Sequence, residues 1–327
     1  MMTGTNPLPR IMLGNDGPTI GIQGLGCMGM SEFYGDTDET EARATLERAL
    51  ELGVTMFDTA DVYGMGENER FLAPFIQAHR DTAVIATKFG YARTSEAPDD
   101  WSLDNRPAFI RHAAENSLRR LGIEVIDLYY MHRRSADVPL AESIGAMADL
   151  VTEGKVRALG LSAVSAQELR DAHAVHPIAA LQSEWSIFTR DIEAEVVPAA
   201  IELDVTIVPY SPLGRGMLTG RAFVKSLGAG DARSYFPRFS AENRDANKRL
   251  VTRIEEIAEG QGVTPAQVAI AWLYAKAAEL GVAVSPIPGT RNRQRLEENL
   301  AAVSLTLEAT TMAALEPLAR EVAGIAV

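Results

Sequence analysis

Short apolar runs alternate with longer stretches of helical period along the whole chain, and this alternation limits the fold more than any other feature. The runs are rich in Val, Ile and Leu, and eight of them are candidate strands: residues 22–27, 54–59, 83–88, 126–132, 156–162, 179–182, 205–211 and 282–287. The candidate helices between them include residues 39–52, 106–121, 140–153, 167–175, 192–203 and 265–279. Such an alternation is typical of parallel βα units.

Residues that are typical of helix termini stand at the ends of several of these candidate helices and support their assignment. Glycine follows three of them, at Gly53, Gly122 and Gly154, and Asp38 and Thr264 stand where N-caps are expected. Eight apolar strands that each precede a helix fit a closed (β/α)8 TIM barrel better than an open doubly wound sheet, although spacing alone also allows the sheet. We therefore predict a single barrel domain over residues 1–327, with its chemistry at the C-terminal ends of the strands.

Charge and cysteine content exclude several classes of function. The chain carries 31 Lys and Arg against 44 Asp and Glu, a net charge of −13, which opposes binding to nucleic acid or to anionic membranes. No apolar run approaches the length of a membrane span, and no secretory signal begins the chain. Cys27 is the single cysteine, so no intrachain disulfide and no cysteine-based metal site is possible. We expect a cytoplasmic protein without metal.

Two long connections do not belong to a minimal barrel. Residues 89–104 and 212–242 both follow candidate strands and both carry aromatic side chains. Long connections in compact domains are commonly functional lids or disordered segments, and aromatic residues favour a pocket wall. We expect Trp101, Phe236 and Phe239 to line a substrate pocket.

Four titratable residues follow three neighbouring strands. Asp58, Lys88 and His132 stand at strand ends, and Tyr63 lies five residues beyond Asp58. On a barrel they converge on one rim. A carboxylate keeps a nearby lysine charged, and a charged lysine lowers the pKa of a nearby phenol, which would make Tyr63 a general acid near neutral pH.

Each of these residues also has an ordinary interpretation. A single Asp, Lys or Tyr at a strand end is commonly a surface residue or part of an ion pair, and His132 alone could be a hydrogen-bonded core histidine. Four of them on adjacent strand ends are harder to explain in that way, because burying a lysine is costly unless it is paired. The remaining histidines fall on helices or helix ends and are interpreted as structural or solvated: His79, His112, His173 and His176.

Glycine-rich segments suggest where an anion could bind. Residues 24–29 match the dinucleotide pattern G-x-G-x-x-G, but no helix opens at the third glycine, so we interpret them as a tight turn at the barrel mouth. Residues 211–216 place two glycines around Arg215. Residues 287–291 open a helix that we expect to carry Arg291 and Arg295 on one face, a favourable anion receptor. Surface arginines paired with Glu297 or Glu298 are the alternative.

The chain resembles the aldo-keto reductase family over nearly its whole length. The resemblance rests on a series of segments in the family's order: GLGCMGMS, FDTADVYG, ATKFG, DLYYMHR, GKVRALGLS, LQSEWS, VPYSPLGRG and IPGTRNRQRLEENL. It implies a (β/α)8 barrel that reduces aldehydes and ketones with hydride from a nicotinamide, usually NADPH. It also implies a catalytic tetrad of Asp58, Tyr63, Lys88 and His132. The segments DLYYMHR and EWSIFTRD are most similar to those of bacterial and plant members that act on small aldehydes, including pyridoxal-like ones.

The same resemblance implies a nicotinamide cofactor site along the strand ends. The implied cofactor-binding residues are Gly26, Cys27, Met28, Ser162, Gln182, Tyr210, Ser211, Leu213, Gly214, Arg215, Gly289, Thr290, Arg291, Arg295, Glu298 and Asn299. Of these, Ser162 and Gln182 would bind the carboxamide and Tyr210 would stack on the ring. The chain departs from many members at Ala163, where they carry Asn.

Two alternatives belong to other classes. Some proteins of this fold serve as nicotinamide-binding regulatory subunits of a membrane channel, and the tetrad alone does not exclude that role. A metal-dependent barrel hydrolase is disfavoured because no His-x-His or HExxH motif occurs and no second histidine accompanies His132 at a strand end. We expect the partner to be a small carbonyl substrate.

Overall fold

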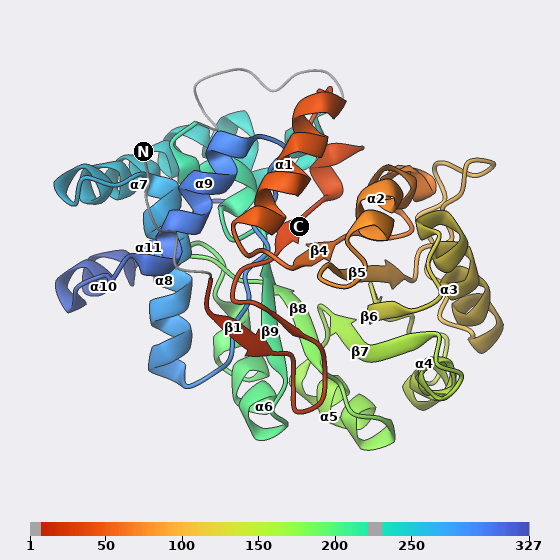
Figure 1. Ribbon diagram of the computed structural model, residues 1–327. Coiled ribbons are helices and arrows are strands. Elements are labelled where there is room, and N and C mark those ends of the chain that lie inside the picture. The colour runs from red at the N-terminus through yellow and green to blue at the C-terminus, as the bar shows by residue number, and fades with distance from the viewer. Residues whose placement is uncertain (1–7, 222–230, 327) are drawn as a thin grey trace.

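A parallel sheet curved into a barrel forms the centre of the protein, and helices surround it (Figure 1). The computed structural model describes residues 8–221 and 231–326. Seven parallel strands follow one another in sequence order: β3 (Leu25–Gly26), β4 (Met56–Asp58), β5 (Val84–Phe89), β6 (Ile126–Met131), β7 (Val156–Ser162), β8 (Ala180–Glu184) and β9 (Thr206–Tyr210). This order, with each neighbour parallel, confirms the predicted barrel class.

All six predicted helical segments are helices in the structure, and the described residues contain further helices that were not predicted. The bounds of all these helices are α1 (Glu39–Glu51), α2 (Glu67–Ala78), α3 (Pro107–Leu121), α4 (Leu140–Thr152), α5 (Ala166–Val175), α6 (Val196–Glu202), α7 (Ala241–Gly260), α8 (Pro265–Leu280), α9 (Arg293–Ala301), α10 (Ala309–Leu315) and α11 (Leu318–Glu321). Asp38 and Thr264 cap α1 and α8 through their side chains, and Gly122 ends α3 with a φ of 64°. No helix in the described ranges is long and apolar enough to cross a membrane.

The eighth predicted strand, residues 282–287, is not a regular strand, and that prediction was wrong in detail. The segment joins β9 through a parallel bridge between Ile207 and Val284, and it joins β3 through a bridge between Gly26 and Gly289. The Gly24 amide also donates to the Pro286 carbonyl at 3.0 Å. Proline has no N–H, so Pro286 and Pro288 interrupt the ladder that a strand needs. The barrel nevertheless closes through this segment.

An antiparallel hairpin that the apolar pattern did not predict precedes the barrel. It consists of β1 (Arg10–Met12) and β2 (Thr19–Gly21). Leu13 and Ile20 are fully buried and belong to one apolar cluster with residues of the strands, among them Leu128. The Gly14 amide donates to the Thr206 hydroxyl at the start of β9. Because β9 runs away from this point, the hairpin covers the N-terminal end of the barrel, opposite the end where chemistry is expected.

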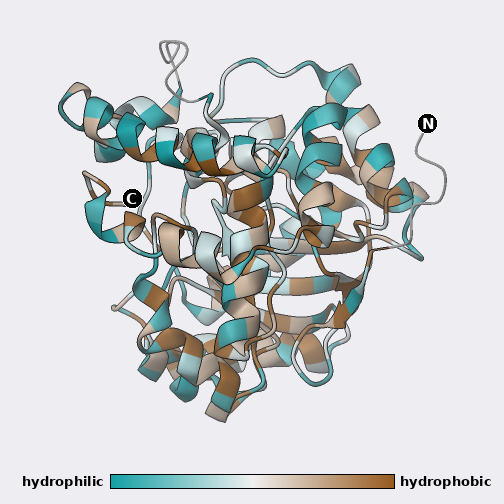
Figure 2. Ribbon diagram, turned by 90° about the vertical axis from the view of Figure 1, so that its left-hand side faces the viewer, coloured by the Kyte–Doolittle hydropathy of each residue, from teal (hydrophilic) through white to brown (hydrophobic). Residues whose placement is uncertain are grey.

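The apolar core lies between the strands and the helices that surround them. In Figure 2 hydrophobic segments occur both on the strands and on the helices, where they alternate with hydrophilic ones. Side chains of the strands alternate between this layer and the barrel interior. Phe57 is buried with α1 and α2 residues in one cluster, whereas its neighbour Met56 belongs to the interior cluster. Asp58 therefore points inward at the end of β4, like Met56 two residues earlier.

The two long connections are ordered where the structure describes them. Tyr91 bridges Leu103 in antiparallel fashion, so residues 89–104 fold back on themselves. The described part of residues 212–242 contains three short 3-10 helices, η4 (Gly214–Thr219), η5 (Ala232–Tyr235) and η6 (Pro237–Phe239). Residues 222–230 of this connection lie outside the described residues. Both connections emerge at the C-terminal ends of strands.

Candidate active site

A buried ion pair lies at the C-terminal end of the barrel. The Lys88 ammonium on β5 donates to Asp58 Oδ1 at 2.5 Å and to the Thr59 carbonyl at 2.8 Å. The second carboxylate oxygen of Asp58 accepts from the Gln182 amide at 2.7 Å. Burial opposes the charge of Lys88, but Asp58 and Tyr63 outweigh it and raise the lysine pKa. Lys88 is therefore a fixed cation inside the barrel.

Tyr63 begins the 3-10 helix η2 (Tyr63–Gly66), which follows β4. Lys88 Nζ lies 5.2 Å from the centroid of its ring. Burial raises the pKa of Tyr63, and Lys88 opposes this rise without reversing it. The expectation that Lys88 lowers the tyrosine pKa below its ordinary value was therefore wrong, because loss of solvent outweighs one nearby cation. The phenol keeps its proton at neutral pH, as a proton donor requires.

His132 directly follows β6 and faces Tyr63. Their ring centroids are 5.8 Å apart in an edge-on arrangement, and the Tyr91 ring also meets the imidazole edge-on, with 5.1 Å between the centroids. Burial, Lys88 and Arg133 lower the pKa of His132 well below its ordinary value. Its buried Nδ1 makes no hydrogen bond within residues 8–221 and 231–326. A neutral imidazole thus stands beside the phenol, and the four predicted residues meet at one place.

Residues expected at a nicotinamide carboxamide lie on the next strands. Ser162 and Gln182 are direct neighbours in the register of β7 and β8, and Tyr210 ends β9. The Ser162 hydroxyl accepts from Arg133 at 3.0 Å. Ala163, which stands where many family members carry Asn, has a φ of 53°. That left-handed conformation suits Asn better than Ala.

The backbone is closely packed at β3, the first strand of the sheet, where it meets residues 287–289. A Cβ on Gly26 would lie 2.9 Å from the Ile287 carbonyl oxygen, so a side chain would not fit without a shift. Cys27 is fully buried, and burial raises the pKa of its thiol. Met28 is partly buried and packs against the cluster that contains Tyr63. Gly26 is also the register partner of Asp58, so this segment lies beside the four residues at the strand ends.

The segment after β9 has the unusual backbone that its two glycines suggested. Left-handed φ angles occur at Ser211 (50°), Gly214 (55°), Arg215 (55°) and Gly216 (92°). Leu213 lies between Ser211 and Gly214 and is the N-cap of η4. Turns of this kind can direct successive N–H groups toward an anion.

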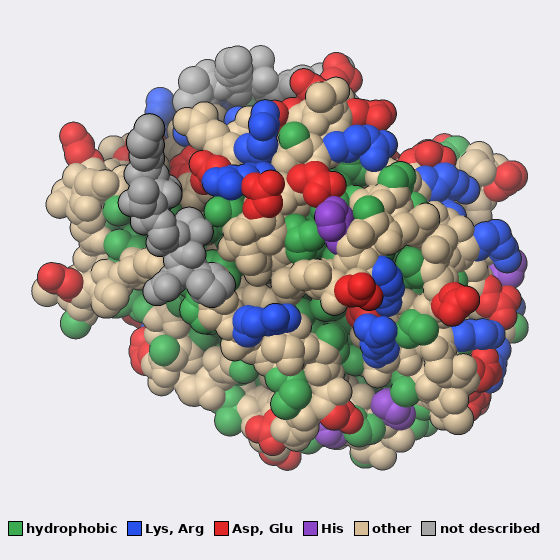
Figure 3. Space-filling view, in the orientation of Figure 1, with side chains coloured by type: hydrophobic (Ala, Val, Ile, Leu, Met, Phe, Trp, Pro, Cys, Tyr) green, Lys and Arg blue, Asp and Glu red, His purple; other side chains and the backbone are tan. Residues whose placement is uncertain are grey.

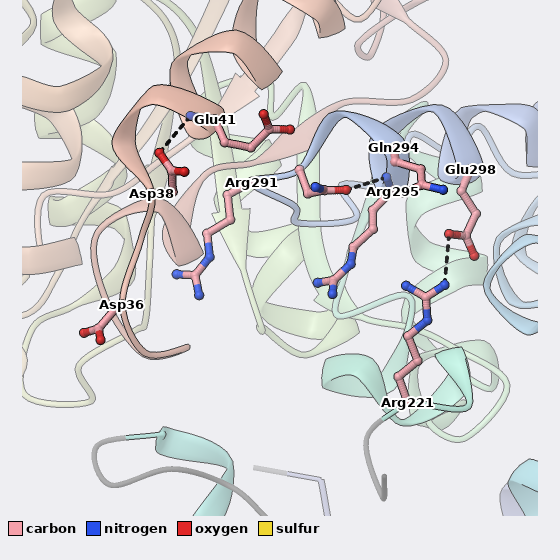
Figure 4. Close-up of a pocket in the computed structure, with 9 residues that line it drawn as sticks. Asp36, Asp38, Glu41, Arg221, Arg291, Gln294, Arg295 and Glu298 are labelled. Carbon is pink, nitrogen blue, oxygen red and sulfur yellow. Dashed lines mark hydrogen bonds and ion pairs between the residues drawn. The ribbon is translucent and has the colours of Figure 1, made fainter. Parts of the chain in front are cut away.

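A polar pocket of about 500 Å³ lies between the start of α9 and the segment before α1 (Figure 4). Its lining residues are Asp36, Asp38, Glu41, Arg221, Arg291, Asn292, Gln294, Arg295 and Glu298. Arg221 pairs with Glu298 at 3.8 Å. Thr290 and the buried Asn299 lie beside this set, before and within α9.

The expectation that Arg291 and Arg295 share one helical face was wrong, because α9 begins at Arg293 with Asn292 as its N-cap. Arg291 precedes the helix, and its guanidinium donates four hydrogen bonds to the segment of residues 29–37, with acceptors at Gly29, Tyr34, Gly35 and Thr37. Arg295 is exposed, and its guanidinium makes no hydrogen bond in the described ranges. Figure 4 shows both side chains directed into the pocket. Glu297 faces elsewhere and pairs with Arg48.

Aromatic rings surround the approach to Tyr63 and His132. Trp101 lies 5.7 Å from Tyr91 and 6.4 Å from Phe33, between ring centroids, and Phe33 meets Tyr63 at 6.5 Å. Sequence reasoning missed Phe33, since nothing in the apolar pattern marks it. Its φ of 74°, rare for a bulky residue, is visible only in the structure.

An ion pair fixes this aromatic group. The Arg93 guanidinium bonds Glu32 at 2.8 Å and stacks over Trp101 at 4.4 Å. Phe236 and Phe239 were expected in the same pocket as Trp101, but they line a separate small cavity together with Glu184, Arg238 and Ile325.

The barrel and its strand-end residues define a class of protein, the barrel oxidoreductases that use a nicotinamide cofactor, and the comparisons agree. The aldo/keto reductase family model matches residues 24–320. The chain therefore belongs to the aldo/keto reductase family. Its members are oxidoreductases that act on small carbonyl compounds with a nicotinamide cofactor.

Relatives include "Probable aldo-keto reductase 1" of Glycine max, which is 43% identical over 299 residues, 91% of this chain and 85% of the relative. The glycerol dehydrogenase AKR11B4 from Gluconobacter oxydans has a TM-score of 0.84 at 28% identity and covers 96% of both chains. The holo form of aldo-keto reductase AKR11C1 from Bacillus halodurans has a TM-score of 0.76 at 28% identity, over 95% of this chain and 96% of that one. The described residues contain no group of three or more His, Cys, Asp or Glu that could hold a metal ion.

Proposed function

We propose that the protein is an NADPH-dependent reductase of small aldehydes and ketones, with Tyr63 as the proton donor. The observation that supports this most is the buried Lys88–Asp58 pair, with an ammonium held 5.2 Å from the Tyr63 ring. A buried charge is costly, and a purely structural role does not require one beside a phenol and a neutral imidazole.

The bound nicotinamide supplies a hydride to the carbonyl carbon of the substrate. Tyr63 donates its proton to the carbonyl oxygen as that oxygen gains charge. Lys88 stabilises the phenolate that remains, and Asp58 holds Lys88 in position. His132, kept neutral by burial, donates a hydrogen bond that orients the carbonyl. All four groups act from the rigid ends of strands or from the turn that follows one.

The residues present fit such a cofactor on physical grounds. The absence of a Cβ at Gly26 and Gly289 lets two backbone segments approach at the rim, and Ser162 and Gln182 offer a hydroxyl and an amide on adjacent strands. Ser211, Leu213, Gly214 and Arg215 would hold the pyrophosphate through backbone N–H groups. Gly289, Thr290, Arg291, Arg295, Glu298 and Asn299 would hold the adenosine end.

The variant Tyr63→Phe tests the assignment of the proton donor. We expect kcat for aldehyde reduction to fall by roughly 10²-fold or more, the usual scale for a lost general acid, while the Kd for NADPH stays unchanged. Steady-state absorbance at the nicotinamide band and fluorescence titration measure the two quantities. Near-normal turnover in this variant would overturn the assignment.

The preference for NADPH over NADH rests on Arg295, whose exposed guanidinium is directed into the polar pocket (Figure 4). Charge-assisted hydrogen bonds of this kind contribute about 1.5 to 3 kcal/mol. Arg295→Ala should therefore raise KM for NADPH by roughly tenfold or more and leave KM for NADH nearly unchanged. Arg293→Ala is the matched control, since Arg293 is an exposed arginine of the same turn that pairs with Glu41. Equal losses with both cofactors would show that Arg295 is structural.

The aromatic group around Trp101 supports a preference for aromatic or small apolar aldehydes over sugars. Phe33, Tyr91 and Trp101 offer ring surfaces near Tyr63 and His132 rather than hydroxyl-binding carboxylates. A higher kcat/KM for a nitrobenzaldehyde than for an aldose would support the preference, and the reverse order would refute it. Pyridoxal-like aldehydes belong in the same panel. The cytoplasm stays the proposed compartment, and the names of the three relatives given above do not support a channel subunit.

A further inference from the structure

A guanidinium lies across the part of the site proposed for the nicotinamide. Arg133 follows His132 at the end of β6, and its Nη1 donates to the His132 carbonyl at 2.7 Å and to the Ser162 hydroxyl at 3.0 Å. Its Cζ lies 5.9 Å from the centroid of the Tyr210 ring. Ser162 and Tyr210 are the residues expected at the carboxamide and on the ring face. Arg133 therefore brings a positive charge to the place where the ring would lie.

No carboxylate neutralises this charge within residues 8–221 and 231–326, where Arg133 forms no ion pair. Asp58 is already paired with Lys88, and Glu184, which faces Tyr210 in the register, lies 3.7 Å from Arg238. The charge acts on the site, because Arg133 contributes, after burial and Lys88, to the lowered pKa of His132. The centre of the site thus holds Lys88 and Arg133 against Asp58.

We propose that Arg133 makes the protein select the reduced nicotinamide over the oxidised one. This inference rests on the proposed cofactor site. The reduced ring is neutral, and it becomes a cation when the C4 hydrogen leaves with its electron pair. A fixed cation beside the ring therefore raises the free energy of the oxidised form and leaves that of the reduced form almost unchanged. The phosphates and the adenosine are the same in both forms, so they cancel in the comparison.

Weaker binding of the oxidised cofactor would affect the step in which this product leaves the site. An aldehyde reductase leaves the oxidised cofactor in its site after each turnover, and the oxidised form competes with the next reduced molecule. By weakening only the oxidised form, Arg133 reduces this competition. The overall equilibrium of the reaction in solution is unaffected, because an enzyme changes only the free energies of bound states.

Binding measurements with three variants test the proposal. Kd values for NADPH and NADP+ are measured by quenching of protein fluorescence on wild type, R133M and R133K. The ratio of Kd for NADP+ to Kd for NADPH should fall about tenfold in R133M, the effect of a unit charge about 6 Å away at an effective dielectric constant of about 40. R133K retains the charge and should keep most of the ratio. Loss of the Arg133–Ser162 hydrogen bond changes both Kd values alike and leaves the ratio unmoved.

R134M is the matched control. Arg134 is the next residue in the chain, but it pairs with Glu168 at 2.8 Å, so its ratio should equal that of wild type. R133Q replaces R133M if the latter fails to fold by circular dichroism. An unchanged ratio in the neutral variants, with both forms still bound, would overturn the role of Arg133 and leave the cofactor site intact. Failure of wild type to bind either form would overturn the proposed function itself.

Discussion

Lys88 is a fully buried lysine with an exposed fraction of 0%, and its surroundings decide what it can do. An unpaired charge at that depth would cost several kcal/mol, so the short contacts with Asp58 and the Thr59 carbonyl are a condition of folding. These contacts leave the ammonium little freedom to move. The ammonium on which the proposed proton donor Tyr63 depends is therefore held in place by the same bonds that stabilise the fold.

Ala163 shows that the strand ends carry local strain. A left-handed φ of 53° costs an alanine about 1 kcal/mol relative to its favoured regions. The Ala163 amide nevertheless donates to the Gln182 carbonyl at 3.0 Å, so the turn continues the hydrogen bonding between β7 and β8. The chain tolerates strain here because the neighbouring strands fix the turn.

The buried imidazole of His132 should make stability depend on pH. Its pKa is lowered in the folded protein, so below about pH 6.5 the unfolded chain takes up a proton that the folded one does not. The free energy of unfolding should therefore fall as the pH drops from 7 to 5, with a share from His132 approaching about 1.4 kcal/mol per pH unit. His132→Gln should remove this share in urea titrations at several pH values.

His112→Gln, the same exchange at an exposed position of α3, is the control for the loss of a histidine as such. A smaller slope should persist in His132→Gln, because partial burial also lowers the pKa of His173. If His132→Gln kept the whole pH dependence of wild type, the neutral state of His132 would not be a property of the folded protein.

At the scale of elements, closure of the barrel depends on the contact between β3 and the segment that ends at Gly289. Gly26→Ala would bring a Cβ within 2.9 Å of the Ile287 carbonyl oxygen, which cannot move without opening the ring of strands. We expect a loss of about 2 kcal/mol in the free energy of unfolding, the usual cost of overpacking. Gly145→Ala in α4 is the control, because nothing lies within 4 Å of its added Cβ. That variant should gain up to about 1 kcal/mol. Equal effects in urea unfolding would contradict the tight closure.

The period of the apolar residues was enough to predict seven of the strands and the helices that follow most of them. It could not predict that Pro286 and Pro288 replace the eighth strand by bridges, because the run 282–287 is as apolar as the others. It could not predict that Arg291 donates hydrogen bonds to carbonyls of residues 29–35, because those partners are about 260 residues away in the chain and no sequence pattern marks them. The proximity of the four proposed tetrad residues could be predicted because Asp58 and Lys88 lie at the C-terminal ends of strands, His132 directly follows one, and Tyr63 lies in the turn after β4.

On the scale of the whole molecule, the net charge of −13 is spread over the surface. Figure 3 shows acidic and basic side chains interspersed on one face. NADPH differs from NADH by a 2′-phosphate, and the proposed preference for NADPH places this phosphate near Arg295 in the polar pocket. The lining of that pocket has the same mixture of charges, with three arginines and four carboxylates. Recognition of the phosphate must therefore come from contact with Arg295 at short range, because the field of the molecule repels an anion from afar.

If the net charge repels the cofactor at long range and Arg295 binds it only on contact, salt should change the rate at which the cofactor associates. Raising the ionic strength from about 10 to about 150 mM shortens the Debye length from about 30 to about 8 Å and screens the repulsion. The association rate constant for NADPH should then rise about two- to fivefold, and that for NADH should rise less because NADH carries less negative charge. Stopped-flow fluorescence with Arg295→Ala as a comparison separates the long-range repulsion from the short-range contact. In the variant the association rate constant should depend on salt as in wild type, and NADPH should dissociate faster. A rate constant that falls with salt would show that the pocket attracts the cofactor over long range, and the argument from net charge would be wrong.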